Sequence, residues 1–121
     1  MRRNGNWNGK DLLRVAQLGL DHRERLVVRS MLRQEPELQR YCTLCECPEE
    51  EPPAHIFLVN ADDPGILERL KTLTARDPAP VTVYVSAHDR HPEGIPVLRK
   101  PIVLRQLLRT LTGIISANRP D

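Results

Sequence analysis

The fold is decided by residues His55 to Pro64, which read HIFLVNADDP. The continuous apolar run Ile56–Val59 is typical of a parallel strand that is covered on both faces. Pro64 suits the first turn of a following helix, where its missing N–H costs nothing. In open α/β sheets, sites form just past the carboxyl ends of the strands. We therefore expect a site at Asn60, Ala61, Asp62 and Asp63, with the neutral amide of Asn60 at the strand tip.

Composition limits the class of protein. The chain has 121 residues, of which 40% are hydrophobic and 28% charged, as expected of one soluble globular domain. No apolar run approaches the roughly 18 residues of a membrane span, and the start MRRNGNWNGK lacks a signal-peptide core. We expect a cytoplasmic protein with no membrane partner. Residues 1–11 are predicted to be a flexible leader, 12–117 one domain, and 118–121 a tail or the start of a linker.

Strand-like and helix-like segments alternate along the chain. Strands are predicted at Leu12–Leu18, Gln39–Cys47, Ile56–Val59, Val81–Val85 and Ile95–Leu98. Helices are predicted from Asp21 to about Arg33, from Gly65 to Leu73, and from about Val103 to Ala117. Asp21, with Glu24 three residues later, has the spacing of a capping box. This alternation indicates an α/β fold with a parallel sheet.

Polar residues follow the predicted strands in a recognisable order. Asn60 stands four residues before Pro64, Ser86-Ala87 follows the fourth strand, and Lys100-Pro101 follows the fifth. In this order and placement, the chain from Leu13 to Ala117 resembles the receiver domain of two-component response regulators. The resemblance implies a flavodoxin-like sheet of five parallel strands in the order 2-1-3-4-5. It also implies a cis bond before Pro101, and it places Asn60 where receivers carry the phospho-accepting Asp.

The departures from the receiver pattern lie at the acidic positions. Gly19 and Leu20 stand where receivers have an acidic pair, which leaves only Asp21 nearby, and Asn60 is a poor nucleophile. Mg²⁺ prefers carboxylate ligands, so we predict no Mg²⁺-dependent phosphorylation. Lys100 should point toward Asn60, with Asp21 or Asp62 close by, and hold the pocket in one state. A shifted register with Asp62 or Asp63 as acceptor is the alternative. The predicted degenerate pocket consists of Gly19, Leu20, Asp21, Asn60, Asp62, Ser86, Lys100 and Pro101.

Two connections are too short for a normal receiver. Seven residues, Pro48 to Ala54, join the second and third strands, and Ser86 to Gly94 with Ile95 join the fourth and fifth. A parallel crossover with its own helix takes about 10 to 12 residues or more. We predict that the second and fourth helices are deleted or reduced, both on the same face of the sheet. That face should expose apolar area for docking, unless a single turn in DRHPEG covers part of it.

Two other groups of residues invite a chemical interpretation. Cys42, Cys45, Cys47 and His55 could supply four zinc ligands, but strand alternation directs Cys42 away from the other two cysteines. Ser86, His88, Asp89 and His91 suggest a hydrolase, yet the sequence has no nucleophile elbow and no glycine-rich loop. We therefore expect buried reduced cysteines, no metal, no cofactor and no enzymatic activity.

These expectations converge on a regulatory function. The sequence predicts a phosphorylation-independent pseudo-receiver that serves signal transduction by binding a protein partner or itself. The alternative is a nucleotide- or nucleic-acid-binding domain, for which the candidate anion-binding residues are Arg23, Arg29, Arg105 and Arg109. The net charge of +2 is too small to imply a polyanion partner by itself. No aromatic residues are interleaved with the arginines for base stacking.

Overall fold

The computed structural model describes residues 12–45, 54–75, 79–88 and 91–118. The predicted leader, the strap between the second and third strands up to residue 53, Cys47, Asp89 and the end of the tail lie outside these described residues. Among the described residues, no helix is long and apolar enough to cross a membrane.

The sheet has five parallel strands in the order β2-β1-β3-β4-β5, which confirms the predicted fold class. β3 is the middle strand, and its register pairs Asn60 with Val85 of β4. The carboxyl ends of β1, β3, β4 and β5 therefore meet at one edge. The strands are β1 Leu13–Leu18, β2 Cys42–Leu44, β3 Ile56–Asn60, β4 Val81–Ser86 and β5 Val97–Arg99.

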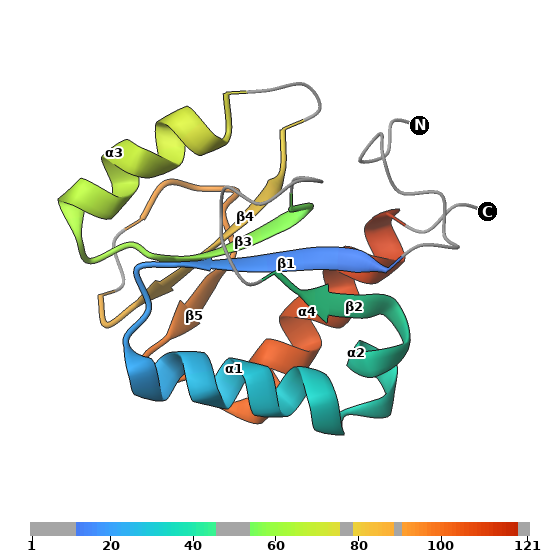
Figure 1. The fold of residues 1–121 in the computed structure, drawn as a ribbon. Coiled ribbons are helices and arrows are strands. Elements are labelled where there is room, and N and C mark those ends of the chain that lie inside the picture. Colours follow the sequence, from blue (N-terminus) through green and yellow to red (C-terminus); the bar gives the residue numbers. More distant parts are fainter. Residues whose placement is uncertain (1–11, 46–53, 76–78, 89–90, 119–121) are drawn as a thin grey trace.

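Helices cover both faces of this sheet. α3 lies on one face, and α1, α2 and α4 lie on the other (Figure 1). α1 starts with the expected capping box, since Asp21 Oδ1 accepts from Glu24 N at 2.8 Å and Glu24 Oε1 accepts from Asp21 N at 2.9 Å. The helices are α1 His22–Gln34, α2 Pro36–Tyr41, α3 Pro64–Leu73 and α4 Leu104–Asn118.

β3 is buried on both faces, as its continuous apolar run predicts. Ile56 and Leu58 belong to the larger core cluster beneath α1 and α4, and Phe57 and Val59 belong to the cluster beneath α3. None of the four side chains is more than 1% exposed. This burial fixes the tip of β3, and with it the position of Asn60.

The prediction of a strand from Gln39 to Cys47 is wrong in its first part. Residues 39–41 belong to the short helix α2, and β2 begins only at Cys42. Pro36 stands in the first helical turn, where its fixed φ favours a helix. Leu38 is completely buried in the core and anchors the helix against α1 and α4. The alternation that suggests a longer strand here is overridden by this packing.

The expected exposure of apolar area on the α3 face is also wrong for the described residues. A hollow of about 750 Å³ does lie on that face, lined in part by Leu67, Tyr84 and His91. Leu67 and Tyr84 are nevertheless only partly exposed and pack on the core, and the His91 ring lies edge-on against Tyr84 at 5.5 Å. The described parts of the β4–β5 connection, 87–88 and 91–96, contain no helix, in keeping with a reduced fourth helix. Large exposed hydrophobic side chains are instead found at Leu12, Leu26, Val103 and Leu104.

Candidate functional site

The candidate site lies at the carboxyl edge of the sheet, where β3, β4 and β5 end. Asn60 is the last residue of β3, and both ends of its side-chain amide are engaged. Nδ2 donates to the Gly19 carbonyl at 3.2 Å, and Oδ1 accepts from Lys100 Nζ at 2.9 Å. Oδ1 also accepts from the backbone N–H of Asp62 at 3.1 Å, which turns the loop back toward the sheet. An aspartate at this position could not donate to Gly19.

The Asp62 carboxylate occupies the centre of the site. Oδ1 accepts from the Ser86 hydroxyl at 2.5 Å, and Oδ2 accepts from the Ala87 backbone N–H at 2.9 Å. Lys100 Nζ lies 3.2 Å from the same Oδ2. A hydroxyl, a backbone amide and an ammonium therefore converge on one anion, which the chain itself supplies.

Charge stabilisation in this cluster is substantial. The hydrogen bond from Ser86, followed by that from Ala87 and by Lys100, lowers the pKa of Asp62 from 3.8 to about 2. Asp62 is therefore a carboxylate at neutral pH. The side chains of Lys100 and Asp62 are only 24% and 20% exposed, so water screens this ion pair less than one on the open surface.

Neighbouring backbone contacts hold the donors in place. Ser86 is fully buried, and its hydroxyl oxygen accepts from the His88 N–H at 3.0 Å while donating to Asp62. The Lys100 N–H donates to the Ser86 carbonyl at 2.9 Å. The peptide bond between Lys100 and Pro101 is cis, which confirms the expectation drawn from the receiver resemblance.

Structural residues, Gly19 and Leu20, occupy the two positions where the receiver resemblance implies an acidic pair. Gly19 has φ +76°, and a Cβ there would lie 2.7 Å from Ile66 Cγ1 of α3. Any side chain at Gly19, including a carboxylate, would collide with α3. Leu20 is buried in the core beneath α1 and α4. The site is therefore built without room for an acid at Gly19.

The other nearby acids cap helices. Asp21 accepts from the Glu24 N–H at the start of α1, and Asp63 accepts from the Gly65 N–H at 2.9 Å at the start of α3. Lys100 meets Asn60 and Asp62, and the ion pairs of the described residues do not join it to Asp21. Of the two acids in the shifted-register alternative, Asp63 is thus a helix cap and Asp62 is held by three donors.

The two cysteines that the structure describes, Cys42 and Cys45, do not converge on one site. Cys42 packs in the cluster beneath α1 and α4, whereas Cys45 packs in the cluster beneath α3. Burial raises the pKa of the Cys42 thiol to about 12, which disfavours the thiolate that a metal would need. His55 is buried, and its Nδ1 accepts from the Arg14 N–H at 2.9 Å. Within the described ranges, no group of three or more His, Cys, Asp or Glu side chains could hold a metal ion.

Three of the residues that suggested a hydrolase, Ser86, His88 and His91, are described and have structural partners. Ser86 Oγ donates to Asp62 and accepts from the His88 N–H, so the hydroxyl is not paired with an imidazole base. The His91 ring nitrogen Nε2 lies 2.9 Å from the His88 carbonyl oxygen, and the ring packs against Tyr84. These contacts stabilise the turn after β4.

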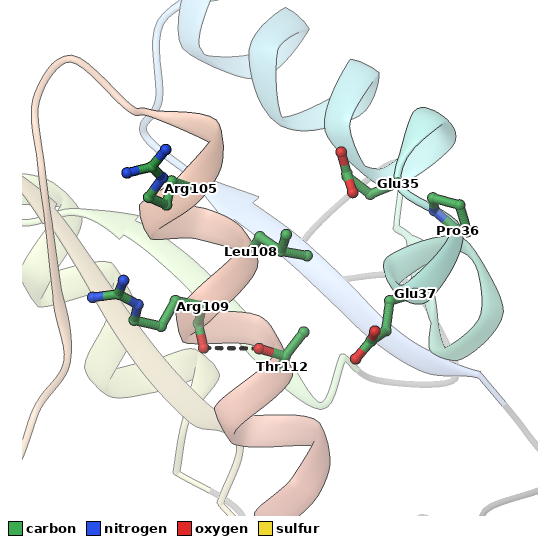
Figure 2. A pocket seen from close by; sticks show the side chains of 7 residues that line it. All are labelled: Glu35, Pro36, Glu37, Arg105, Leu108, Arg109 and Thr112. Atoms are coloured by element: carbon green, nitrogen blue, oxygen red, sulfur yellow. Dashed lines mark hydrogen bonds between the residues drawn. The ribbon is translucent and has the colours of Figure 1, made fainter.

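The candidate anion-binding arginines are not gathered into one patch. Arg105 and Arg109 line a hollow of about 480 Å³ together with Glu35 and Glu37 (Figure 2). Arg29 lines a different hollow beside β2, and Arg23 is exposed and lines neither. An anion at Arg105 and Arg109 would have two carboxylates on the opposite wall.

Comparisons with known proteins gave no match among family models, curated proteins or solved structures.

The sequence predicts most of the residues of the pocket, but it does not predict that the Asp62 carboxylate occupies the centre of the pocket. Asp62 is predicted to belong to the pocket, yet its binding to Ser86 and Ala87 is not anticipated, and neither is the contact of Ile66 with Gly19. One feature of the sequence could have indicated the pairing of Asp62 with Lys100. Lys100, expected beside a neutral Asn60, needs a counter-charge, and Asp62 is the acid nearest to Asn60 in the sequence.

Proposed function

We propose that the chain is a receiver-like regulatory domain that works in the cytoplasm without phosphorylation, by binding a protein partner or a second copy of itself. The observation that carries this proposal is the position of the Asp62 carboxylate, which accepts from Ser86, Ala87 and Lys100 together. These three donors would otherwise be available to an external anion. Here the anion is a permanent part of the chain.

Because the anion in the pocket is the carboxylate of Asp62, which belongs to the chain, the domain keeps one conformational state. A ligand shifts an equilibrium only by the difference in its affinity for the two states. An incoming phosphoryl group would have to displace a carboxylate that is held by a hydroxyl, an amide and an ammonium. The neutral Asn60 supplies no nucleophile, and an acid at Gly19 would have to displace the Ile66 side chain. The domain accordingly presents a constant surface to its partner, with no chemical switch at the pocket.

The arginine-rich alternative has less support. Arg105 and Arg109 share their hollow with Glu35 and Glu37, and Arg29 lies at another hollow. A nucleotide or nucleic acid bound there would be repelled by the two carboxylates.

The test is a phosphorylation assay on the wild type and on Asn60→Asp. Each is incubated with acetyl phosphate and Mg²⁺, and the intact mass is measured, with a phosphorylatable receiver in parallel as the control for donor activity. We expect no phosphorylated product from either protein. Asn60→Asp restores a carboxylate at the strand tip, but Asp62 still holds the donors and positions 19 and 20 still lack acids. A covalent phosphate on either protein would overturn the proposal.

A further inference from the structure

An exposed apolar strip lies on the helical face opposite α3. Leu26 of α1 is 48% exposed, Leu104 at the start of α4 is 42% exposed, and Val103 beside it is 51% exposed. Leu26 and Leu104 line one hollow of about 360 Å³, together with Val27 and Met31. The strip therefore follows a groove between α1 and α4, and single exposed leucines elsewhere would not make such a surface.

Charged walls continue this groove. Glu35 lines both the apolar hollow and the neighbouring hollow that contains Glu37, Arg105 and Arg109. The acids stand on the α1–α2 side, and the arginines stand on α4. Figure 2 shows both guanidinium groups turned away from the two carboxylates, and no ion pair of the described residues joins the two walls. One side of the groove is thus acidic and the other basic, with neither neutralised by its neighbour.

A surface with this pattern is complementary to itself. In a two-fold dimer the same patch of both subunits meets, so each contact occurs twice. The acidic wall of one copy can then face the basic wall of the other, while the exposed leucines form the buried centre. Charge placed at the rim of an apolar centre is the usual anatomy of a protein interface.

We propose that the groove between α1 and α4 is a self-association surface whose occupant is a second copy of this chain. The proposal rests on the proposed function in that it names the partner of a protein-binding module. It is tested by a separate measurement, because the phosphorylation assay does not depend on oligomeric state. A dimer that failed to form would leave the filled pocket unaffected.

The first experiment follows the mass of the whole chain by light scattering over a wide range of concentration. The wild type should change from monomer to dimer as concentration rises. Leu104→Ser should weaken the dimer at least about tenfold, as expected of a central apolar contact. Leu12→Ser is the matched control, because Leu12 is 39% exposed but lies outside the groove, and it should leave the dissociation constant unchanged. A wild type that stays monomeric, or equal effects of the two substitutions, would overturn the proposal.

The second experiment uses charge reversal. One variant carries Arg105→Glu and Arg109→Glu, and the other carries Glu35→Arg and Glu37→Arg. Glu35 makes no side-chain capping bond at α2, so its replacement removes no cap. Each variant alone should be monomeric at concentrations where the wild type dimerises, and an equimolar mixture should recover the dimer mass. Circular dichroism checks that both variants fold. A mixture of two folded variants that stays monomeric would contradict the two-fold arrangement of the walls.

Discussion

Asp62 and Asp63 are neighbours in the sequence but accept hydrogen bonds from different groups. Asp62 binds Ser86, Ala87 and Lys100 across the strand ends, whereas Asp63 caps α3 locally. Asp62→Asn should lower the free energy of unfolding by about 1–3 kcal/mol, because it removes the charge that these donors satisfy. Asp63→Asn should cost at most about 1 kcal/mol, since asparagine is an equally good N-cap. Urea unfolding measures both, and equal effects would contradict the assigned roles.

The contribution of Asp62 should also depend on pH in one direction. Its pKa is lowered mainly by the Ser86 hydroxyl, to about 2 in the folded protein from 3.8. The folded state therefore binds this proton more weakly than the unfolded state does. The stability that Asp62 contributes is fully present above about pH 4 and is lost as the pH falls toward about 2. The difference in unfolding free energy between wild type and Asp62→Asn should follow this course, whereas a difference that grows on acidification would refute it.

At the scale of elements, the contact between the β1–α1 turn and α3 leaves little space for a side chain at Gly19. Gly19 has φ +76° and meets Ile66, whereas Gly94 has φ +88° and has nothing within 4 Å of its Cβ position. Gly94→Ala should therefore show only the conformational cost, about 1–2 kcal/mol. Gly19→Ala should cost about 1–3 kcal/mol more because of the clash. Thermal or urea unfolding measures the two variants.

A double variant separates the two costs. Ile66→Ala removes the atoms that a Cβ at Gly19 would meet, so Gly19→Ala should cost less in that background, after allowance for the cavity. If Gly19→Ala costs the same with and without Ile66, the collision with α3 does not explain the absence of a side chain at Gly19.

Some helices and strands could be predicted from sequence patterns, and others could not. The continuous apolar run of β3 predicts its burial, because a strand that is apolar at every position needs cover on both faces. α2 was missed, because the residues around Tyr41 and Cys42 alternate like a strand while Leu38 anchors a short helix. Pro36 in the first helical turn was the available sign. The role of Asp62 depends on the loop conformation, in which the Asp62 N–H donates to the Asn60 side chain. Hydrophobic periodicity does not predict such a loop conformation.

At the scale of the whole molecule, the strand order agrees with what the receiver resemblance implies, whereas the exposed surface could not be predicted from the sequence. The short β4–β5 connection correctly indicates that no full helix lies there, since its described parts contain none. It does not reveal that Leu67 and Tyr84 are partly covered, nor that α2 contacts both α1 and α4 beside an open groove. Surface exposure depends on how whole helices pack, so the sequence did not predict the exposed Leu26, Val103 and Leu104 on the face opposite α3.

The central claim is that Asp62 is the permanent anion of the pocket, and its titration tests this most directly. The carboxyl carbon of Asp62 is followed by NMR as the pH is lowered, in the wild type and in Ser86→Ala. We predict a wild-type pKa of about 2, and a higher pKa in Ser86→Ala, because the strongest stabilising hydrogen bond is lost. A wild-type pKa near the ordinary 3.8, unchanged by Ser86→Ala, would show that the carboxylate does not occupy the site and would contradict the account.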